Sequence, residues 1–389
     1  MEIYILDSLL RRVQVIDRFQ SLIWTERFSE TGDFQLVVYS TTETRGQFVS
    51  GILLAMNQSY RVMVVETVEK TADEDDRELI TIKGRSLEMI LLKRVAKHTM
   101  DNTTADPPWH LVGTPTAIAR QIFGDICVNG TLDPGDKIPF YTPGNIFPVD
   151  TIGEPTDSIT IDLEPATVYD AIKQLADLYD FGFRLIRNFD TSQLYFNIYM
   201  GSNRTTAQVT LPAVVFSPQL GNVQSTSELT TIEAAMNVAY VFSPAGSVVV
   251  YAEGVDPDVA GFDRQVLLVN ATDVTDPTNI AAVLTQRGKD ALKQNRGYAA
   301  FDGEVSENGT YKYGIDYNLG DLVEIQNVDG FTNQLQVTEQ IFVSDDQGER
   351  SYPTLSVNLS IMPGTWLAWD FNQMWHDLDS NMTTWSDQV

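Results

Sequence analysis

The stretch RVMVVETVEKTADEDDRELITIKGRSLEMILLKRV, residues 61–95, carries the most regular pattern in the first third of the chain. Its first part begins apolar on both faces and becomes half polar, and the acidic run TADEDD that follows is typical of an exposed turn. The return strand places Ile80 and Ile82 on one face, because side chains alternate along a strand. Ser86 can cap the short helix that we expect next. The stretch therefore predicts a β-hairpin followed by a helix.

Residues 1–60 contain further short strands. In DFQLVVYS, residues 33–40, apolar side chains recur at every second position from Phe34 onward. This period is typical of a strand with at least one buried face. We expect Trp24 and Phe28 to pack on the same sheet.

Helices are expected at three places further along the chain. Thr114 is a candidate N-cap, with Pro115 at the first helical position. In DLEPATVYDAIKQLADLYDFGFRLI, apolar residues recur at i, i+3 and i+4, which predicts the strongest helix. We expect that helix to begin at Pro165 and to end at Gly182. A third helix is expected from about residue 279 to about residue 295.

Most of the other segments read as strands. FGFRLIRN and QLYFNIYMG follow the strongest helix and form a small α/β unit with it. A β-rich part covers about residues 208–270. The last strands include NQLQVTEQIFVS and SYPTLSVNLSIM, with DDQG as the hairpin turn between them. Helical and strand segments together indicate a mixed, α+β fold.

The chain of 389 residues has 26 basic and 53 acidic side chains and a formal net charge of −27. Binding to nucleic-acid phosphates or to an anionic membrane surface needs clustered Lys and Arg, so both are disfavoured. The charge indicates either simple solubility or an acidic surface past which DNA slides without sticking. No apolar run approaches the ~18 residues of a membrane helix, and MEIYILDSLLRR is not a signal peptide. We expect synthesis in a cytoplasm and no membrane insertion by the chain itself.

Residues with catalytic or metal-binding potential are few and scattered. The single cysteine, Cys127, is expected to be buried and structural, and His98, His110 and His376 lack zinc-ligand spacing. The acidic run at residues 73–76 lacks the glycine and terminal Glu of an EF-hand loop and indicates a solvated turn. Nucleophile-elbow, phosphate-loop and dinucleotide-binding motifs do not occur.

We therefore expect no catalytic residue, no cofactor and no metal site. A carboxylate pair for glycoside hydrolysis stays open, since so many acidic residues are present. By elimination, the residues indicate a structural or interaction protein.

Residues 363–389 hold four of the chain's six tryptophans, Trp366, Trp369, Trp375 and Trp385. So much aromatic surface is rarely left in water. The segment docks either on the chain's own core or on a neighbouring subunit or another protein, and the sequence favours neither. We hypothesise that the four tryptophans are partner-docking residues.

Several segments form a set: RELITIKGRSLEMILLKRV, TVYDAIKQLADLYDFGFRL, VVFSPQLGNV and the later NVAYV. In sequence and in order, this set resembles a family of siphophage tail-tip proteins. The most specific piece is YKYGIDYNLGDLVEIQN, followed by VTEQIF, DDQGE and YPTLSV. The resemblance covers about residues 1–360. It is to the baseplate hub, or tail-associated protein, which is similar to the trimeric hub of contractile tails.

This resemblance implies β-barrel-like domains with small inserted α/β domains. An N-terminal hub domain would cover residues 1–97, and its C-terminal counterpart residues 301–362, the two packing together as a ring-forming platform. Between them would lie an inserted α/β domain with a loop-rich start, residues 98–207, and a second, β-rich inserted domain that ends in a helix, residues 208–300. Residues 363–389 would form the Trp-rich tail.

The resemblance also implies a virion protein of the tail tip without enzymatic activity. It would form a homotrimeric ring that closes the tail tube and opens as a channel for DNA ejection. Its partners would be copies of itself, the distal tail ring, the tape measure protein and receptor-binding or fibre proteins, with DNA passing through unbound. Relatives often carry a lytic or host-binding extension, which is not expected here. The alternatives are a tail-borne cell-wall hydrolase and a carbohydrate-binding adhesin.

Overall fold

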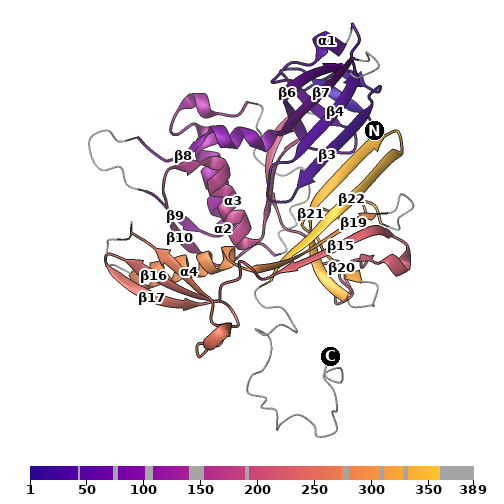
Figure 1. The fold of residues 1–389 in the computed structure, drawn as a ribbon. Coiled ribbons are helices and arrows are strands. Elements are labelled where there is room, and N and C mark those ends of the chain that lie inside the picture. Colours follow the sequence, from indigo (N-terminus) through magenta and orange to yellow (C-terminus); the bar gives the residue numbers. More distant parts are fainter. Residues whose placement is uncertain are drawn as a thin grey trace, which may run out of the picture. The chain divides into compact units, whose positions relative to one another are not determined.

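The computed structural model of the chain (Figure 1) forms two compact units. The first combines Met1–Glu228 with Ala300–Val357, and the second is built from Leu229–Ala299. Two strands, β15 (Val223–Thr231) and β19 (Gly297–Val305), connect them. The structure describes residues 1–42, 44–72, 78–100, 108–139, 153–188, 192–272, 274, 280–305, 311–326 and 332–359. The acidic run at residues 73–76 and the Trp-rich tail lie outside these residues.

The elements of the first unit come from both ends of the chain. Before β15 they are β1 (Ile3–Leu6), β2 (Arg12–Ile16), β3 (Ser21–Arg27), β4 (Asp33–Tyr39), α1 (Thr44–Gln47), β5 (Leu53–Met56), β6 (Val62–Ala72), β7 (Glu78–Ser86), the 3₁₀ helix η1 (Leu87–Lys93), β8 (Val95–Ala96), β9 (Trp109–Gly113), α2 (Pro115–Phe123), the π-helix η2 (Gly124–Asn129), β10 (Ile159–Leu163), β11 (Ala166–Thr167), α3 (Val168–Tyr179), β12 (Gly182–Arg187), β13 (Leu194–Tyr199) and β14 (Val215–Phe216). After β19 they are β20 (Leu322–Gln326), β21 (Thr332–Asp345) and β22 (Gly348–Leu359).

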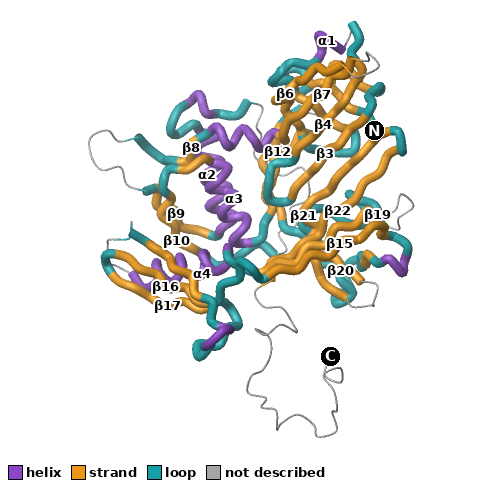
Figure 2. The backbone as a smooth tube through the Cα atoms, in the orientation of Figure 1, coloured by secondary structure: helices purple, strands orange, loops and turns teal. Residues whose placement is uncertain are grey.

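A thirteen-stranded sheet is the frame of the first unit, and its long strands are seen side by side in Figure 2. The strand order is β15-β19-β22-β21-β3-β4-β7-β6-β5-β1-β2, with β20 beside the first half of β21 and β14 beside β20. Among the described strands, this path ends at β15 and β2 and does not close on itself. The α+β class is confirmed, and the two ends of the chain that we expected to be barrel-like are parts of one open sheet.

Strands β3 and β21 join the two ends of the chain directly. They pair antiparallel, with Trp24 opposite Phe342, and both side chains are buried in the same core. Arg27 lies opposite Glu339 and forms an ion pair with it at 2.5 Å. Its guanidinium also lies 2.5 Å from the Asp33 carboxylate on β4. The ladder therefore has an apolar half and an ionic half.

The hairpin predicted from residues 61–95 is confirmed as β6 and β7, with a register shift between Val65 and Thr67. The helix after it is the 3₁₀ helix η1, and the prediction that Ser86 caps it is wrong. The Ser86 hydroxyl oxygen instead accepts a hydrogen bond from the Gly32 backbone N–H at 2.8 Å. Ser86 therefore links β7 to the turn before β4.

The predicted helices are present, with one boundary moved. In α2 the Thr114 side chain accepts from the Ala117 backbone N–H, so this N-cap is confirmed. The strongest helix, α3, begins after Thr167 and not at Pro165, because the Thr167 hydroxyl accepts from the Asp170 backbone N–H. It ends at Tyr179, and its C-cap Asp180 adopts a left-handed conformation two residues before the predicted stop at Gly182.

An α/β layer formed by α2, α3 and the β12–β13 hairpin shares one core with the first strands of the sheet. Helix side chains such as Ile122 and Ile172 are fully buried in it together with Leu6 and Val62. The small α/β unit predicted from this region is therefore confirmed.

Trp24 and Phe28 both pack on the thirteen-stranded sheet, as predicted. Phe28 does not lie in the core of Trp24, because β3 ends at Arg27 and its alternation stops there. The Phe28 ring instead meets Tyr199 of β13 edge-on, 5.3 Å between ring centroids. Two glycines make room for it. A Cβ atom added at Gly182 would lie 2.6 Å from the Phe28 ring, and one at Gly320 would lie 2.3 Å from it.

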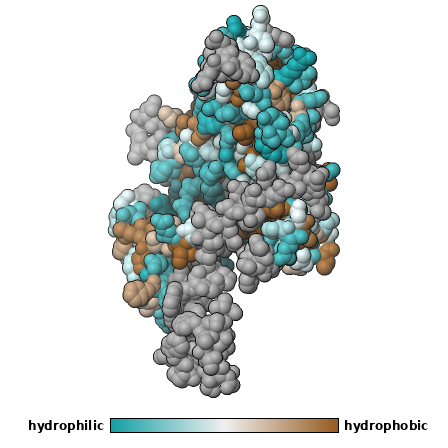
Figure 3. Space-filling model, turned by 45° about the vertical axis from the view of Figure 1, so that its right-hand side comes forward, coloured by the Kyte–Doolittle hydropathy of each residue, from teal (hydrophilic) through white to brown (hydrophobic). Residues whose placement is uncertain are grey.

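The second unit is a three-stranded sheet, β16 (Val238–Ser243), β17 (Gly246–Tyr251) and β18 (Val266–Asn270), covered on one face by α4 (Ile280–Gln294). The predicted third helix is thus confirmed. The core of the second unit contains Val241, Val250 and Leu284. The side chains of the opposite face are largely exposed, among them Phe242, Val249 and Leu268, and apolar side chains are visible on this unit's surface in Figure 3.

The Phe28 contact yields a first prediction. Gly182→Ala should lower the free energy of unfolding by about 1–3 kcal/mol, since its Cβ overpacks against Phe28 and Tyr199. Urea denaturation followed by circular dichroism measures this. Gly46→Ala is the control, because nothing lies within 4 Å of a Cβ there. Equal stability of the two variants would contradict the packing described.

Candidate functional site

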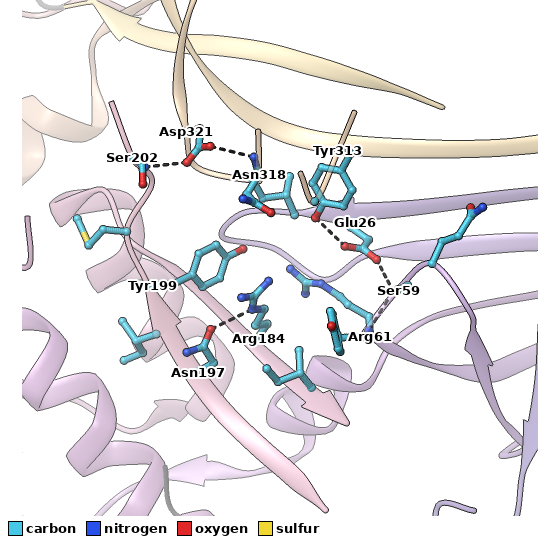
Figure 4. Close-up of a pocket in the computed structure, with 17 residues that line it drawn as sticks. Glu26, Ser59, Arg61, Arg184, Asn197, Tyr199, Ser202, Tyr313, Asn318 and Asp321 are labelled. Atoms are coloured by element: carbon cyan, nitrogen blue, oxygen red, sulfur yellow. Dashed lines mark hydrogen bonds between the residues drawn. The ribbon is translucent and has the colours of Figure 1, made fainter. Parts of the chain in front are cut away.

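A polar cavity of about 320 Å³ lies in the first unit, where the sheet, the β12–β13 hairpin and a loop near residue 318 meet (Figure 4). Its walls come from parts of the chain that are far apart in the sequence. They comprise Glu26, Gln58, Ser59, Tyr60, Arg61, Arg184, Ile186, Asn197, Ile198, Tyr199, Met200, Ser202, Tyr313, Gly314, Asn318, Leu319 and Asp321.

The inner wall contains Arg61, which is half of a buried ion pair. Arg61, the first residue of the stretch that predicted the hairpin, is 1% exposed, and Glu88 of η1 is 0% exposed. Arg61 Nη1 donates to Glu88 Oε1 at 2.8 Å, and Arg61 Nη2 donates to the Arg27 carbonyl at 2.5 Å. Glu88 Oε1 also accepts from the Leu185 backbone N–H at 2.7 Å. One carboxylate thus ties η1, β12 and the sheet together.

The charges of this pair depend on each other. Burial is the largest single cause and acts to lower the pKa of Arg61. The charge interactions with Glu88, Tyr199, Glu26 and Tyr313, in that order of size, together outweigh it, so the pKa is raised and Arg61 stays charged. Not every polar atom of the pair is satisfied: Arg61 Nε and Glu88 Oε2 are buried without a hydrogen-bond partner in the part of the chain that the structure describes. Removing either member would leave an uncompensated buried charge.

Glu26 holds the next wall of the cavity. Its carboxylate accepts hydrogen bonds from the Ser59 hydroxyl and, at 3.1 Å, from the Tyr313 hydroxyl. Ser59 in turn accepts from the Arg61 backbone N–H at 3.0 Å. Burial, followed by the charge of Glu26, raises the pKa of Tyr313 well above its usual value, so its hydroxyl is a neutral donor.

The β12–β13 hairpin contributes a second guanidinium. Arg184 donates from Nε to Asn197 Oδ1 at 3.0 Å and lies over the Tyr199 ring, 4.1 Å from its centroid. The Tyr199 hydroxyl donates to the Phe28 carbonyl at 3.3 Å. Figure 4 shows Arg184, Arg61, Tyr199 and Tyr313 gathered around the same space.

Asp321 closes the far end of the cavity. It accepts from the backbone N–H groups of Ser202 at 2.7 Å and Asn318 at 2.9 Å, and lies 3.5 Å from Arg204. Burial raises the pKa of the Asp321 carboxyl, although the two backbone donors oppose this. The loop near residue 318 is therefore fixed to the end of β13.

The residues that line the cavity can bind a molecule through hydrogen bonds and charge. Among the described residues, no group of three or more His, Cys, Asp or Glu side chains is placed to hold a metal ion. Cys127 is buried in the α/β layer, as predicted, and burial raises the pKa of its thiol to about 12. His110 pairs with Asp162 at 2.7 Å on the exposed β9–β10 ribbon, and His98 lies by Trp109.

The predicted site residues and the observed cavity do not coincide. Trp366, Trp369, Trp375 and Trp385 lie outside the described residues, so their docking role stays a prediction. Sequence reasoning missed the cavity residues altogether. Two signals were available: an arginine at the head of the apolar run RVMVV, and a glutamate inside the apolar helix SLEMILL. A charge in such a position is typical of a buried pair.

No helix in the described part of the chain has the length and apolar character needed to span a membrane.

The ion pair yields a second prediction. Arg61→Met should lower the free energy of unfolding by about 3–5 kcal/mol, because Glu88 is left buried and charged. The double variant Arg61→Met/Glu88→Leu should regain much of that loss. Urea denaturation of both single variants and the double variant gives the coupling energy.

Arg45→Met is the matched control, since the Arg45–Glu78 pair is about half exposed on both sides. We expect it to cost at most about 1 kcal/mol. An Arg61→Met effect as small as this, or no recovery in the double variant, would contradict the structural role of the pair.

Residues 2–354 match the protein family described as Siphovirus ReqiPepy6 Gp37-like protein. No curated protein matches the chain by sequence.

Solved structures of tail proteins have a similar fold over almost their whole length. A tail protein from Neisseria meningitidis MC58 is 13% identical, with a TM-score of 0.57, covering 94% of this chain and 98% of that one. The 43 kDa tail protein of prophage MuSo2 from Shewanella oneidensis is 15% identical, with a TM-score of 0.53 and coverage of 91% and 97%. Prophage tail protein gp18 from Listeria monocytogenes EGD-e is 14% identical, with a TM-score of 0.51 and coverage of 93% and 96%.

The family match spans nearly all of the chain that carries the observed sheet and cavity, and the structural likeness, at such low identity, concerns the fold alone. Together they confirm the resemblance to siphophage tail proteins. The chain belongs to the siphovirus ReqiPepy6 Gp37-like family and has the fold of phage and prophage tail proteins.

Proposed function

We propose that this protein is the structural hub of a phage tail tip, a homotrimeric ring that closes the tail tube and opens as a channel for DNA, without catalysis of its own. The observation that carries the proposal is the continuous sheet. The β3–β21 ladder joins the two ends of the chain into one platform. A rigid platform of this kind is suited to the mechanical role of a ring subunit.

Two further features support assembly with other chains. The sheet path ends in strands β2 and β15 among the described residues, and an unpaired edge strand is a template for pairing with another chain. On β2, Val13 and Val15 are exposed. The apolar outer face of the second unit adds to this, because contiguous exposed apolar patches are typical of interaction surfaces.

The net charge of −27 per chain is consistent with DNA passage. If part of it lines a channel, like-charge repulsion keeps phosphates off the wall within a screening length of about 8–10 Å. In the virion we propose copies of this chain, the distal tail ring, the tape measure protein and fibre or receptor-binding proteins as partners. A channel wall lined with Lys and Arg would contradict this role of the charge.

The third prediction concerns symmetry. Purified full-length protein should have three times the mass of one chain by light scattering, and negative-stain images should show a three-fold ring with a central channel. Since a hub can need its neighbours to assemble, tail tips are imaged as well. A monomer in solution, combined with tail tips that lack a three-fold ring of this protein, would contradict the proposal.

The absence of catalysis is tested on dye-labelled host cell walls. We expect no dye release above buffer from the purified protein. Release that rises with protein concentration would favour a cell-wall hydrolase instead.

The fourth prediction concerns the tail. We propose that the tryptophans of residues 363–389 dock a neighbouring tail component. Trp369→Ala/Trp375→Ala should weaken incorporation of that component, because each buried interface tryptophan contributes about 2 kcal/mol or more. Mass spectrometry of purified tails measures the composition. Trp369→Phe/Trp375→Phe, which keeps aromatic surface, should lose less, and an unchanged composition in the alanine variant would overturn the docking role.

A further inference from the structure

We propose that the polar cavity of the first unit binds a neutral carbohydrate, about one or two sugar units in size. This inference goes beyond the hub role and stands or falls separately from it. It rests on the charge balance, the hydrogen-bonding groups and the volume of the cavity.

The charge balance excludes most other small polar ligands. Arg61 and Arg184 line the cavity together with two carboxylates, Glu26 and Asp321, so the formal charges of the lining cancel. Outside the lining, Glu88 adds a negative charge beside Arg61, and Arg204 adds a positive charge beside Asp321. A small anion would meet two carboxylates as well as the guanidinium groups, and a small cation would meet two guanidinium groups as well as the carboxylates. A neutral ligand is favoured.

The hydrogen-bonding groups match a ligand that both donates and accepts. The hydroxyls of Tyr199 and Tyr313 and the guanidinium of Arg184 line the cavity. The side-chain amides of Gln58 and Asn318 each offer a donor and an acceptor in one plane, and both residues are exposed at the opening. Sugar hydroxyls donate and accept in the same way, at close spacing around a ring.

The size and the remaining lining agree with this class. A volume of about 320 Å³ lies at the small end of the usual range for ligand pockets. Ile198, Met200 and Leu319 supply apolar wall between the polar groups, which suits the C–H faces of a sugar ring.

The fifth prediction is that the full-length protein binds a sugar saturably, with millimolar affinity. The probes are D-glucose, D-galactose, D-mannose, D-arabinose, L-rhamnose and N-acetyl-D-glucosamine, each also as its methyl glycoside, and inorganic phosphate as the anionic control. Saturation-transfer NMR detects binding. Binding of the methyl glycoside indicates a unit linked in a polymer, whereas binding of the reducing sugar alone indicates a free sugar.

The cavity is tested with Gln58→Ala and Asn318→Ala, which change exposed side chains at its opening. Each should weaken binding about fivefold, the effect of one lost hydrogen bond. Asn129→Ala, an exposed amide on η2 outside the cavity lining, should leave it unchanged. The proposal is overturned if no probe sugar binds, if phosphate binds more tightly than every sugar, or if the two cavity variants bind as well as Asn129→Ala.

Discussion

The ion pair between Arg61 and Glu88 is the constraint on which the rest of the first unit depends. Both side chains are almost completely buried, and their hydrogen bonds reach the Arg27 carbonyl and the Leu185 backbone N–H. The sheet, η1 and the β12–β13 hairpin must therefore hold one relative position, because any other leaves a charge in a place where water cannot solvate it. The apolar cores on either side stabilise the first unit, and the ion pair fixes the relative position of the sheet, η1 and the β12–β13 hairpin.

The same pair explains why a polar cavity exists beside it. A guanidinium and a carboxylate in the interior need further polar groups around them. Beside the pair, the Arg61 backbone N–H donates to the Ser59 hydroxyl, which donates to Glu26, and Glu26 also accepts from the Tyr313 hydroxyl. Apolar packing then cannot fill the space without breaking these hydrogen bonds. Phe28, held between Gly182 and Gly320, closes the apolar side of the same region.

Local structure could be predicted from the sequence to a large extent, whereas long-range pairing could not. The β6–β7 hairpin, α2, α3 and α4 follow from the periodicity of apolar residues and from caps within a few positions. The start of α3 was missed because Thr167, and not Pro165, has the side-chain acceptor that the first turn requires. The Arg27–Glu339 and Arg61–Glu88 pairs join residues that no local sequence pattern connects. The contact between the two ends of the chain, which includes Arg27–Glu339, was expected only from the resemblance to a hub protein.

The walls of the cavity come from three parts of the chain that are far apart in the sequence. Glu26 belongs to β3, Arg184 to the β12–β13 hairpin, and Asp321 to the loop that leads into β20. A molecule that fills the cavity contacts all three parts at once. Its binding energy therefore favours the arrangement in which they meet, and this arrangement is the one that the buried ion pair and the β3–β21 ladder already hold. In a hub subunit, ligand binding and platform rigidity would then reinforce each other through the same few residues.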